Sequence, residues 1–514
     1  MSDKAKAGKL SGRLIFNLIL FGLIGQIAWN VENMYFNTFL YNSIYKGASQ
    51  AAIDSSINVI DAVSKMVAYS AITAMLTTLI MGALSDRKGS RNKFISVGYI
   101  IWGVIIGGFG LISKDNVASV LGISDPAKIL TTTVWIVIVM DMVMTFVGST
   151  SNDASFNAWV TDSTNSHNRA TAESILAFMP IAALGLVLAL GGVLLAGNDV
   201  QKSYEYFFLI LGAVVLVCGI IGLFTLKDAP KTIENSGSFF SDLIYGLKPS
   251  VIKENSKLYL TLLAVCAYSI AVQVFFPYLI IYLQHSPDGF FNSNELKITP
   301  ALIIIAVVSL VVLVAGIILI GKLVDKYGKN KLVIPMLVLF VVGLVILYFA
   351  HDLKLLLIGV VPTAIGYCLL GIMLNAAVRD FTPESKTGLF QGVRMIFAVM
   401  IPMVVGPYVG KKAIYSSGVH YIDDYGVSQI VPASSMFLYA AIVCAVALIP
   451  IIVIFCKGGF AVAENEKDWL WKIRLARRVL FLYRKTYKNQ THNFVYKVDF
   501  WIYKYKLYWQ SAVL

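Results

Sequence analysis

Long apolar stretches alternate with short polar ones along most of the chain. Twelve stretches are long enough for an α-helix to cross a bilayer, which takes about 20 residues. They cover residues 14–42, 59–84, 94–113, 130–160, 171–196, 204–226, 257–284, 299–323, 331–350, 353–378, 388–412 and 431–456. A polar connection, 227–256, follows the sixth. The pattern predicts an all-α membrane protein of two six-helix halves, 14–226 and 257–456, joined by a cytoplasmic linker.

Basic residues predict the orientation of these helices, because cytoplasmic loops retain Lys and Arg. The loops after the second and eighth stretches carry four basic residues each, and the loops on the opposite side carry single lysines such as Lys46 and Lys202. Residues 1–13 are also basic, and the run that follows is too long for a cleaved signal peptide. We expect both termini in the cytoplasm and the protein in the cell membrane, as a monomer.

The C-terminal tail, residues 457–514, differs from the rest. It holds twelve Lys and Arg residues against four acidic ones, interleaved with aromatic residues. Beside a membrane, anionic lipid headgroups are the nearest partner for such a segment. We expect membrane-surface helices; a partly disordered extension and a specific partner site are the alternatives.

Composition excludes several classes of protein. Only 14% of the residues are charged, against about 25% in soluble domains, and the mean hydropathy is +0.74. A soluble enzyme and a disordered chain are therefore excluded. The net charge is +13, of which the tail carries +8, so no nucleic-acid partner is needed to explain it. The five cysteines and five histidines show no metal-ligand spacing. No nucleotide-binding or catalytic motif occurs, so we expect no metal, no cofactor and no enzymatic activity.

Two short motifs occur once in each half. Residues 82–89 (GALSDRKG) and 321–328 (GKLVDKYG) both read G-x-L-x-D-basic-x-G. Residues 157–164 and 375–382 both read N-A-x-V-x-D-x-T, each at the end of a predicted helix. Two motif pairs at equivalent places indicate an internal repeat.

The first motif resembles the signature of the major facilitator superfamily, where it joins helices two and three and recurs between eight and nine. The resemblance covers about residues 13–456 and implies two helical bundles around a central cavity with alternating access. A charged loop that only fixes topology is the alternative. The residues expected to act in gating are Gly82, Asp86, Arg87, Gly89, Asp162, Gly321, Asp325, Asp380 and Arg394. For Arg394 we favour a cytoplasmic gate with Asp380.

A second resemblance is to the glycoside–pentoside–hexuronide group of cation symporters. It rests on Trp29-Asn30, residues 148–154 and residues 388–394. In that group, acids one turn apart on helix two and an acid on helix four bind the coupling cation. Here Asp61 is the matching acid, and Lys65 stands in place of the second one. Asp61 is thus a candidate for coupling, although an ion pair with Lys65 is the interpretation we favour.

Polar residues inside the first predicted helix form a narrow stripe. Its members, spaced four, three and four residues apart, are Gln26, Asn30, Asn33 and Asn37. At 100° per residue they share one face, which we expect to meet substrate or water; hydrogen bonds between helices are the alternative. Glu32 points away from this stripe and is either a proton site or half of a buried ion pair.

The fourth predicted helix repeats this arrangement. Asp141, Ser149 and Asn152 fall within one arc, with Asp153 beside it. At ~1.5 Å per residue, Asp153 lies about 10 Å from the cytoplasmic end and Asp141 about 28 Å from it, near the outer surface. Asp153 is therefore the stronger candidate for binding a proton or a sugar hydroxyl. A structural ion pair is the alternative.

The seventh predicted helix contains Gln273, Pro277 and Tyr278. A tyrosine ring and amides suit a sugar, with its apolar ring face and its hydroxyls. We therefore expect a secondary active transporter, a symporter of a sugar or glycoside with H⁺ or Na⁺. An exporter of amphipathic compounds and a non-transporting receptor or scaffold are the alternatives.

Overall fold

The computed structural model of this chain is helical almost throughout. It describes residues 10–88, 90–164, 169–197, 199–228, 246–285, 329–351, 353–382, 387–422 and 426–460. The predicted helix at 299–323, most of the linker and residues 461–514 of the tail lie outside these ranges. Within the described part, ten helices are long and apolar enough to cross a membrane.

The first half, residues 10–228, contains the first six of the predicted helices. They are α2 (Gly12–Asn30) continued by η1 (Val31–Phe36), α3 (Asn37–Phe39) and η2 (Leu40–Ile44), α5 (Val59–Lys88), α6 (Arg91–Phe109), α8 (Pro126–Gly148) continued by η3 (Ser149–Phe156) and α9 (Asn157–Ser163), α10 (Arg169–Leu194) and α11 (Val200–Thr225). Two short helices, α4 (Gln50–Asp54) and α7 (Lys114–Leu121), lie in the connections. All of these helix ends fall within four residues of the prediction.

The second half, residues 246–460, follows the same plan. Its long helices are α14 (Ser256–Phe275) continued by the short η4 (Phe276–Tyr278) and α15 (Leu279–His285), α17 (Lys329–Tyr348), α18 (Leu353–Phe381), α19 (Thr387–Met395) continued by η6 (Ile396–Met400) and α20 (Ile401–Ser417), and α21 (Ser435–Val446) followed by α22 (Leu448–Cys456). A short helix, α13 (Pro249–Glu254), precedes them. Strands β1 (His420–Ile422) and β2 (Ser428–Ile430) form an antiparallel hairpin, with Tyr421 opposite Gln429.

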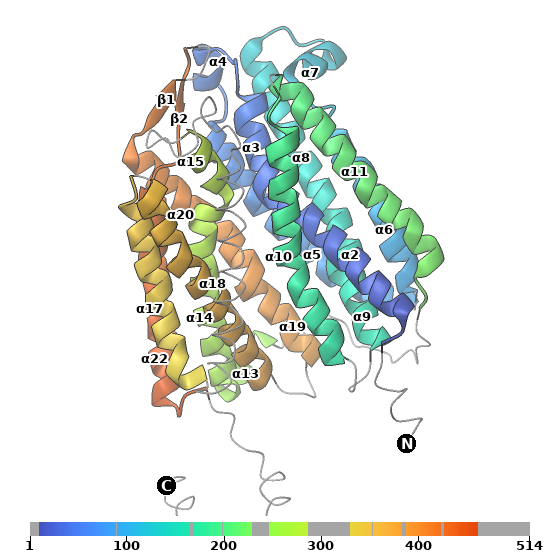
Figure 1. Ribbon diagram of the computed structural model, residues 1–514, viewed down its shortest axis with the longest axis vertical. Helices are drawn as coiled ribbons and strands as arrows, with labels where there is room; N and C mark the ends of the chain where they lie inside the picture. Colours follow the sequence, from blue (N-terminus) through green and yellow to red (C-terminus); the bar gives the residue numbers. More distant parts are fainter. Residues whose placement is uncertain are drawn as a thin grey trace, which may run out of the picture. The chain divides into compact units, whose positions relative to one another are not determined.

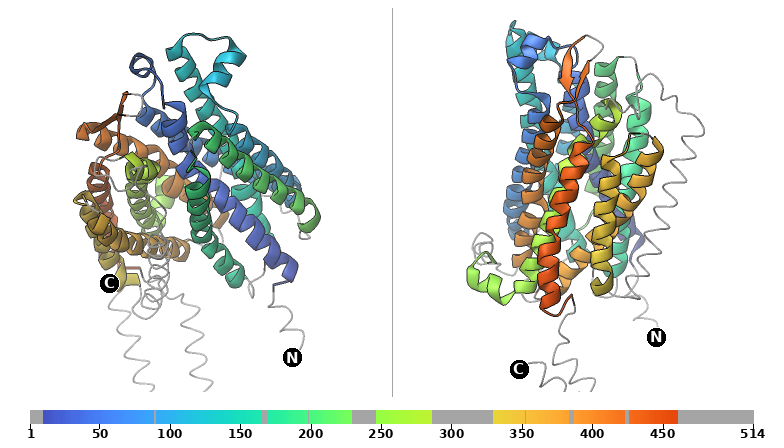
Figure 2. Two further views of the ribbon diagram at one scale, coloured as in Figure 1. Left: turned by 45° about the horizontal axis from the view of Figure 1, so that its top comes forward. Right: turned by 90° about the vertical axis from the view of Figure 1, so that its left-hand side faces the viewer.

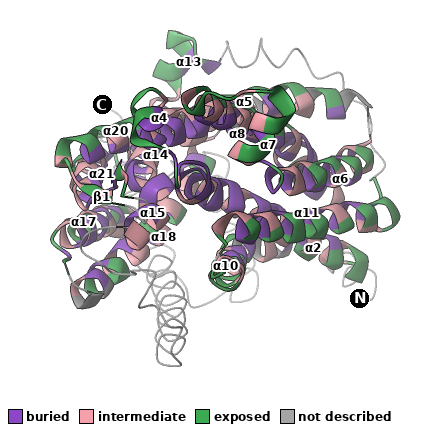
Figure 3. Cartoon of the chain, turned by 90° about the horizontal axis from the view of Figure 1, so that it is seen from above, coloured by how far each residue is buried: buried purple, intermediate pink, exposed green. Residues whose placement is uncertain are grey.

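Glycine allows helices α6 and α11 to pack closely. A Cβ atom at Gly103 would lie 2.4 Å from the Leu216 nitrogen, and one at Gly212 would lie 2.5 Å from the Gly103 carbonyl oxygen. Small residues at such contacts let helix backbones approach within a membrane. Exposed apolar side chains such as Val104 and Phe224 cover the outward faces, while the buried faces turn toward neighbouring helices (Figure 3). The surface of the described helices is therefore suited to lipid.

The two halves meet at one end of the helices. Helix α5 packs against α20 and η6, η1 packs against η4, and α3 packs against α15. We call this end, which carries α4 and the β1–β2 hairpin, the hairpin end (Figures 1 and 2). The opposite end, where α2 begins, is the N-terminal end.

Three of the long helices contain π-helical segments. They are η1 and η2 in the first, η3 in the fourth and η6 in the eleventh. A π-turn adds a residue to the turn and shifts all following side chains around the helix axis, and such segments are frequent at functional sites. The expectation of uninterrupted helices with 100° per residue was wrong at these places.

Candidate functional site

A buried group of acidic and hydroxyl side chains lies inside the first half. Glu32 on η1 accepts hydrogen bonds through its Oε1 atom from the Ser70 hydroxyl at 2.6 Å and the Thr145 hydroxyl at 2.9 Å. The Oε2 atom is buried without a partner among the described residues. Asp141 interacts electrostatically with Glu32, and its carboxyl group shares a hydrogen bond with Ser70. The side chains of Glu32 and Asp141 are 6% and 1% exposed.

No lysine or arginine among the described residues forms an ion pair with Glu32, Asp141 or Asp153. Two carboxyl groups without a cation that share the Ser70 hydroxyl can exchange a proton or bind a small cation that prefers oxygen ligands. Of the two roles expected for Glu32, the ion pair has no cationic partner among the described residues, and the role as a proton site stays a prediction.

Asp141 lies inside the long helix of α8, η3 and α9, which begins at Pro126 and continues to Ser163. At ~1.5 Å per residue, Asp141 is about 22 Å from the first residue and about 33 Å from the last. The helix is longer at both ends than predicted, and Asp141 is buried in the bundle. Its depth in the membrane stays a prediction.

Asp153 and Asn152 lie on η3. The Asp153 Oδ2 atom accepts a hydrogen bond from the Ser149 hydroxyl at 2.9 Å, and the carboxyl group is partly exposed. The Asn152 amide donates to the Tyr99 hydroxyl at 2.7 Å, and its oxygen accepts from the Trp29 indole at 3.3 Å. Asn152 is thus held on both sides, whereas the Asp153 carboxyl group has a single described hydrogen bond.

Glycine makes room for this arrangement. A Cβ atom at Gly25 of α2 would lie 2.3 Å from Asn152 Nδ2 and 2.6 Å from the Tyr99 hydroxyl. The amide of Asn152 therefore depends on a residue without a side chain on the facing helix.

The polar stripe of the first helix divides into two pairs. Gln26 and Asn30 are partly exposed, and the structure describes no hydrogen bond for either side chain. Asn33 and Asn37 donate to carbonyl oxygens one turn earlier, at 2.7 and 2.8 Å, and Asn37 is fully buried. Because η1 shifts the register, the single stripe expected from 100° per residue does not form.

A cavity of about 680 Å³ lies in the second half, lined by α14, α18 and the helix of α19, η6 and α20. Gln273, one of the expected substrate residues, lines it, and its Oε1 atom is buried without a partner among the described residues. Arg394 lines it as well, and its Nη2 atom donates to Asn375 Oδ1 at 3.3 Å. The cavity thus contains both charge and hydrogen-bonding groups.

Ion pairs and hydrogen bonds join the halves at the hairpin end. Asp61 Oδ1 lies 2.7 Å from Lys411 Nζ and accepts from the Tyr415 hydroxyl at 3.2 Å. The expected ion pair of Asp61 with Lys65 was wrong: the Lys65 ammonium lies 5.8 Å from the ring centroid of Trp135. Asp61 is therefore a link between α5 and α20, the first and second halves.

Tyr278 belongs to the same contact. It is fully buried, and its hydroxyl lies 2.7 Å from the Ser64 hydroxyl and donates to the Pro407 carbonyl oxygen at 3.0 Å. Asn42 adds a further link, donating to Gln284 Oε1 at 2.9 Å. Tyr278, expected to bind substrate, thus lies in the contact between the halves and not on the wall of the second-half cavity.

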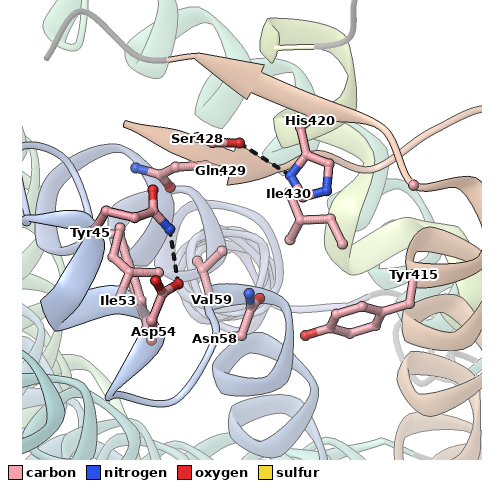
Figure 4. A pocket seen from close by; sticks show the side chains of 12 residues that line it. Tyr45, Ile53, Asp54, Asn58, Val59, Tyr415, His420, Ser428, Gln429 and Ile430 are labelled. Carbon is pink, nitrogen blue, oxygen red and sulfur yellow. Dashed lines mark hydrogen bonds between the residues drawn. The ribbon is translucent and has the colours of Figure 1, made fainter. Parts of the chain in front are cut away.

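A smaller cavity of about 230 Å³ opens beside this contact (Figure 4). Its walls come from both halves, with Asp54 and Asn58 on one side and Tyr415 and the β1–β2 hairpin on the other. His420 and Ser428 pair across the hairpin at 3.4 Å. Because both halves form its walls, this cavity depends on their contact at the hairpin end.

The expected gate residues at the N-terminal end form separate networks in each half. Arg91, at the start of α6, pairs with Asp162 at 3.2 Å and also donates to Ser85. In the second half, Lys329 at the start of α17 pairs with Asp380. The expected gate of Arg394 with Asp380 was wrong in this structure, because Asp380 pairs with Lys329 and Arg394 with Asn375.

The remaining gate residues can be placed only in part. Gly82 lies in α5, and a Cβ atom added there would meet no atom of a neighbouring element within 4 Å. Asp86 and Arg87 lie at the end of α5, and their side chains are outside the described part. Gly89, Gly321 and Asp325 are outside the described residues altogether.

Sequence reasoning missed several residues of these sites. The hydrogen bonds of Ser70 and Tyr99 and the ion pair of Lys411 all reach other helices, so helical spacing gives no signal for them. Lys411 carried one signal, a charge inside an apolar stretch. Within the described ranges, no group of three or more His, Cys, Asp and Glu residues could hold a metal ion.

A comparison with protein-family models identifies one family. The family model described as "Major Facilitator Superfamily" matches residues 33–290 and 261–487. No curated protein matches the sequence.

Solved structures resemble the chain over most of its length. A structure of a variant of the nucleoside transporter NupG has a TM-score of 0.61 at 13% identity, covering 86% of this chain and 99% of that one. The xylose transporter XylE from E. coli in an inward-open conformation has a TM-score of 0.57 at 14% identity, covering 85% and 95%. A bacterial homologue of the lysosomal transporter Spinster, inward-facing and occupied, also has 0.57 at 14%, covering 87% and 97%.

Proposed function

The chain belongs to the major facilitator superfamily, and we propose that this transporter is a symporter that couples a proton or a sodium ion to a small hydroxylated solute of the sugar or glycoside type. The observation that carries the proposal is the buried pair of Glu32 and Asp141, which has no cationic partner among the described residues. Such a pair is costly inside a membrane unless a proton or cation occupies it.

The solute side of the proposal rests on the polar groups that have free hydrogen-bonding capacity. Gln26 and Asn30 in the first half and Gln273 in the second are amides, and Asp153 is a partly exposed carboxylate. Amides and a carboxylate suit a solute with several hydroxyls. One of the similar solved structures is that of a D-xylose-proton symporter, which supports the same class without assigning it.

The orientation of the chain is part of the proposal. The N-terminal end carries Arg13, Arg91 and Lys329, and basic residues are retained in the cytoplasm. We place both termini there and the hairpin end outside. The second-half cavity then belongs to the solute pathway that alternating access exposes to one side at a time.

Uptake into liposomes that contain the purified full chain tests the proposal. Labelled D-xylose, D-glucose and uridine, together with acidic derivatives of the last two, would be offered under an imposed proton gradient, a sodium gradient or neither. We expect one gradient to drive accumulation of at least one solute above its outside concentration. Equal, gradient-independent equilibration of every solute would overturn the symport, and empty liposomes are the control.

A further inference from the structure

The cavity of the second half contains arginine charge that no acidic residue of the described part neutralises. Arg394 and Arg379 both line it, and the two guanidinium groups interact electrostatically. Arg394 is partly buried within a predicted membrane helix, and its described hydrogen bond is to the neutral amide of Asn375. A cation without an acidic partner at such a place is costly and indicates a functional role.

The acidic residues that could neutralise Arg394 are occupied or absent from the described surroundings. Asp380 pairs with Lys329, and Glu32 is bonded to Ser70 and Thr145 inside the other half. Among the described residues, no Asp or Glu forms an ion pair with Arg394 or Arg379. The predicted helix at 299–323, outside the described part, contains no acidic residue in its sequence.

The lining of the cavity changes from aromatic to cationic along α18. Tyr367, Asn375 and Arg379 line the cavity over about 18 Å of α18 at ~1.5 Å per residue, within an arc of about 120° at ~100° per residue. The ring of Tyr367 stacks on Tyr268 with centroids 5.9 Å apart. Gln273 lines the same cavity, and its Oε1 atom is buried without a described partner. One end is therefore aromatic and the other cationic.

We propose that the transported solute is a small hydroxylated organic anion whose carboxylate or phosphate group binds Arg394 and Arg379. The planar guanidinium group matches both anions with paired N–H donors. A hydroxyl of the solute donates to Gln273 Oε1, and its apolar face lies on Tyr367. This inference rests on the proposed function, because it takes the second-half cavity as the solute site.

The sign of the charge has a consequence for coupling. A monovalent anion that moves with one proton carries no net charge across the membrane, whereas a neutral sugar with one proton carries one positive charge. Uptake of the anion at a fixed proton gradient is then insensitive to membrane potential, and uptake of a neutral solute is not. This difference separates the two classes of solute independently of affinity.

The first arm of the test compares matched solutes in liposomes with the full chain. D-Glucose is paired with D-gluconate and glucose 6-phosphate, and uridine with uridine 5′-monophosphate, at one imposed gradient. We expect accumulation of an anionic member of a set and not of its neutral partner; the gluconate and phosphate arms separate the two anion types. Accumulation of the neutral members alone would overturn the anion site and leave the symport intact. No driven accumulation of any member would overturn both.

The second arm uses variants, read on the anion that accumulates. Arg394→Gln should raise its half-saturation concentration about tenfold or more, since a hydrogen bond to a charged group contributes at least about that factor. Arg394→Lys keeps the charge but not the paired N–H donors, so its half-saturation concentration should lie between those of Arg394→Gln and the wild type. The matched control is Lys412→Gln, an exposed lysine outside the cavity, which should leave uptake unchanged. Equal slowing of anionic and neutral solutes by Arg394→Gln, with unchanged half-saturation, would assign Arg394 to gating instead.

Discussion

Single residues decide how the buried polar groups are held. In the first half, Asn152 is fixed by Tyr99 and Trp29, whereas Glu32 is bonded only through Oε1 and its Oε2 atom has no described partner. Asp153 has a single described hydrogen bond, from Ser149 one turn earlier. We therefore separate side chains with full sets of partners, which stabilise the bundle, from those with spare hydrogen-bonding capacity, which we propose bind solute or ion.

Asp153→Asn tests the side chains that have spare hydrogen-bonding capacity. The substitution keeps the shape of the side chain but removes its charge, so we expect gradient-driven accumulation to fall by at least about tenfold, the scale of a lost charge-assisted contact. Uptake into liposomes measures it, with membrane insertion checked by protein yield. Asp115→Asn, on the exposed short helix α7, is the control. Normal accumulation by Asp153→Asn would remove Asp153 from the solute pathway.

Gly25→Ala tests the side chains that have full sets of partners, here Asn152. The added methyl group would meet Asn152 and Tyr99 at 2.3 and 2.6 Å, and overpacking of this kind costs about 1–3 kcal/mol. We expect a lower thermal unfolding midpoint in detergent. Gly185→Ala, which has open space around it, should not lower the midpoint. Equal midpoints for both variants would show that the facing helices do not hold Asn152 this tightly.

Helices α5 and α20 form a large part of the contact between the halves. Helices α5 and α20 are joined by Asp61, Lys411 and Tyr415. The π-helical segments η1, η3 and η6 occur in helices that carry the candidate sites or border the contact. A π-turn leaves backbone groups less regularly paired than an α-turn, which makes these segments suitable places for bending during alternating access.

Asp61→Asn should loosen the hairpin end. The neutral amide cannot form the ion pair with Lys411, so we expect the open fraction at this end to increase. The distance between spin labels at Val120 and Ile422, both exposed at the hairpin end, reports it. Lys411→Gln should act in the same direction, and the double variant should add little to either single one. Glu254→Gln, at an exposed acid in α13, is the control, and an unchanged distance in Asp61→Asn would contradict the role of the ion pair.

At the scale of the molecule, the sequence predicted the plan of the helices better than the partners of their side chains. Apolar runs located the helices because lipid requires about 20 apolar residues per crossing, and the motif pairs indicated the two halves. The pairs Asp61–Lys411 and Arg91–Asp162 link residues 350 and 71 positions apart, and no local pattern encodes such distances. The register of the polar stripe failed at η1, because π-turns have no simple sequence signal.

The central claim is that Glu32 and Asp141 couple solute movement to an ion. Glu32→Gln separates coupling from movement, because it removes the ionisable group and leaves a side chain of the same size. The most direct measurement compares, in the same liposomes, gradient-driven accumulation with gradient-free exchange of labelled for unlabelled solute. We expect Glu32→Gln to lose accumulation and keep exchange. Accumulation and exchange that both remain at wild-type levels would contradict it.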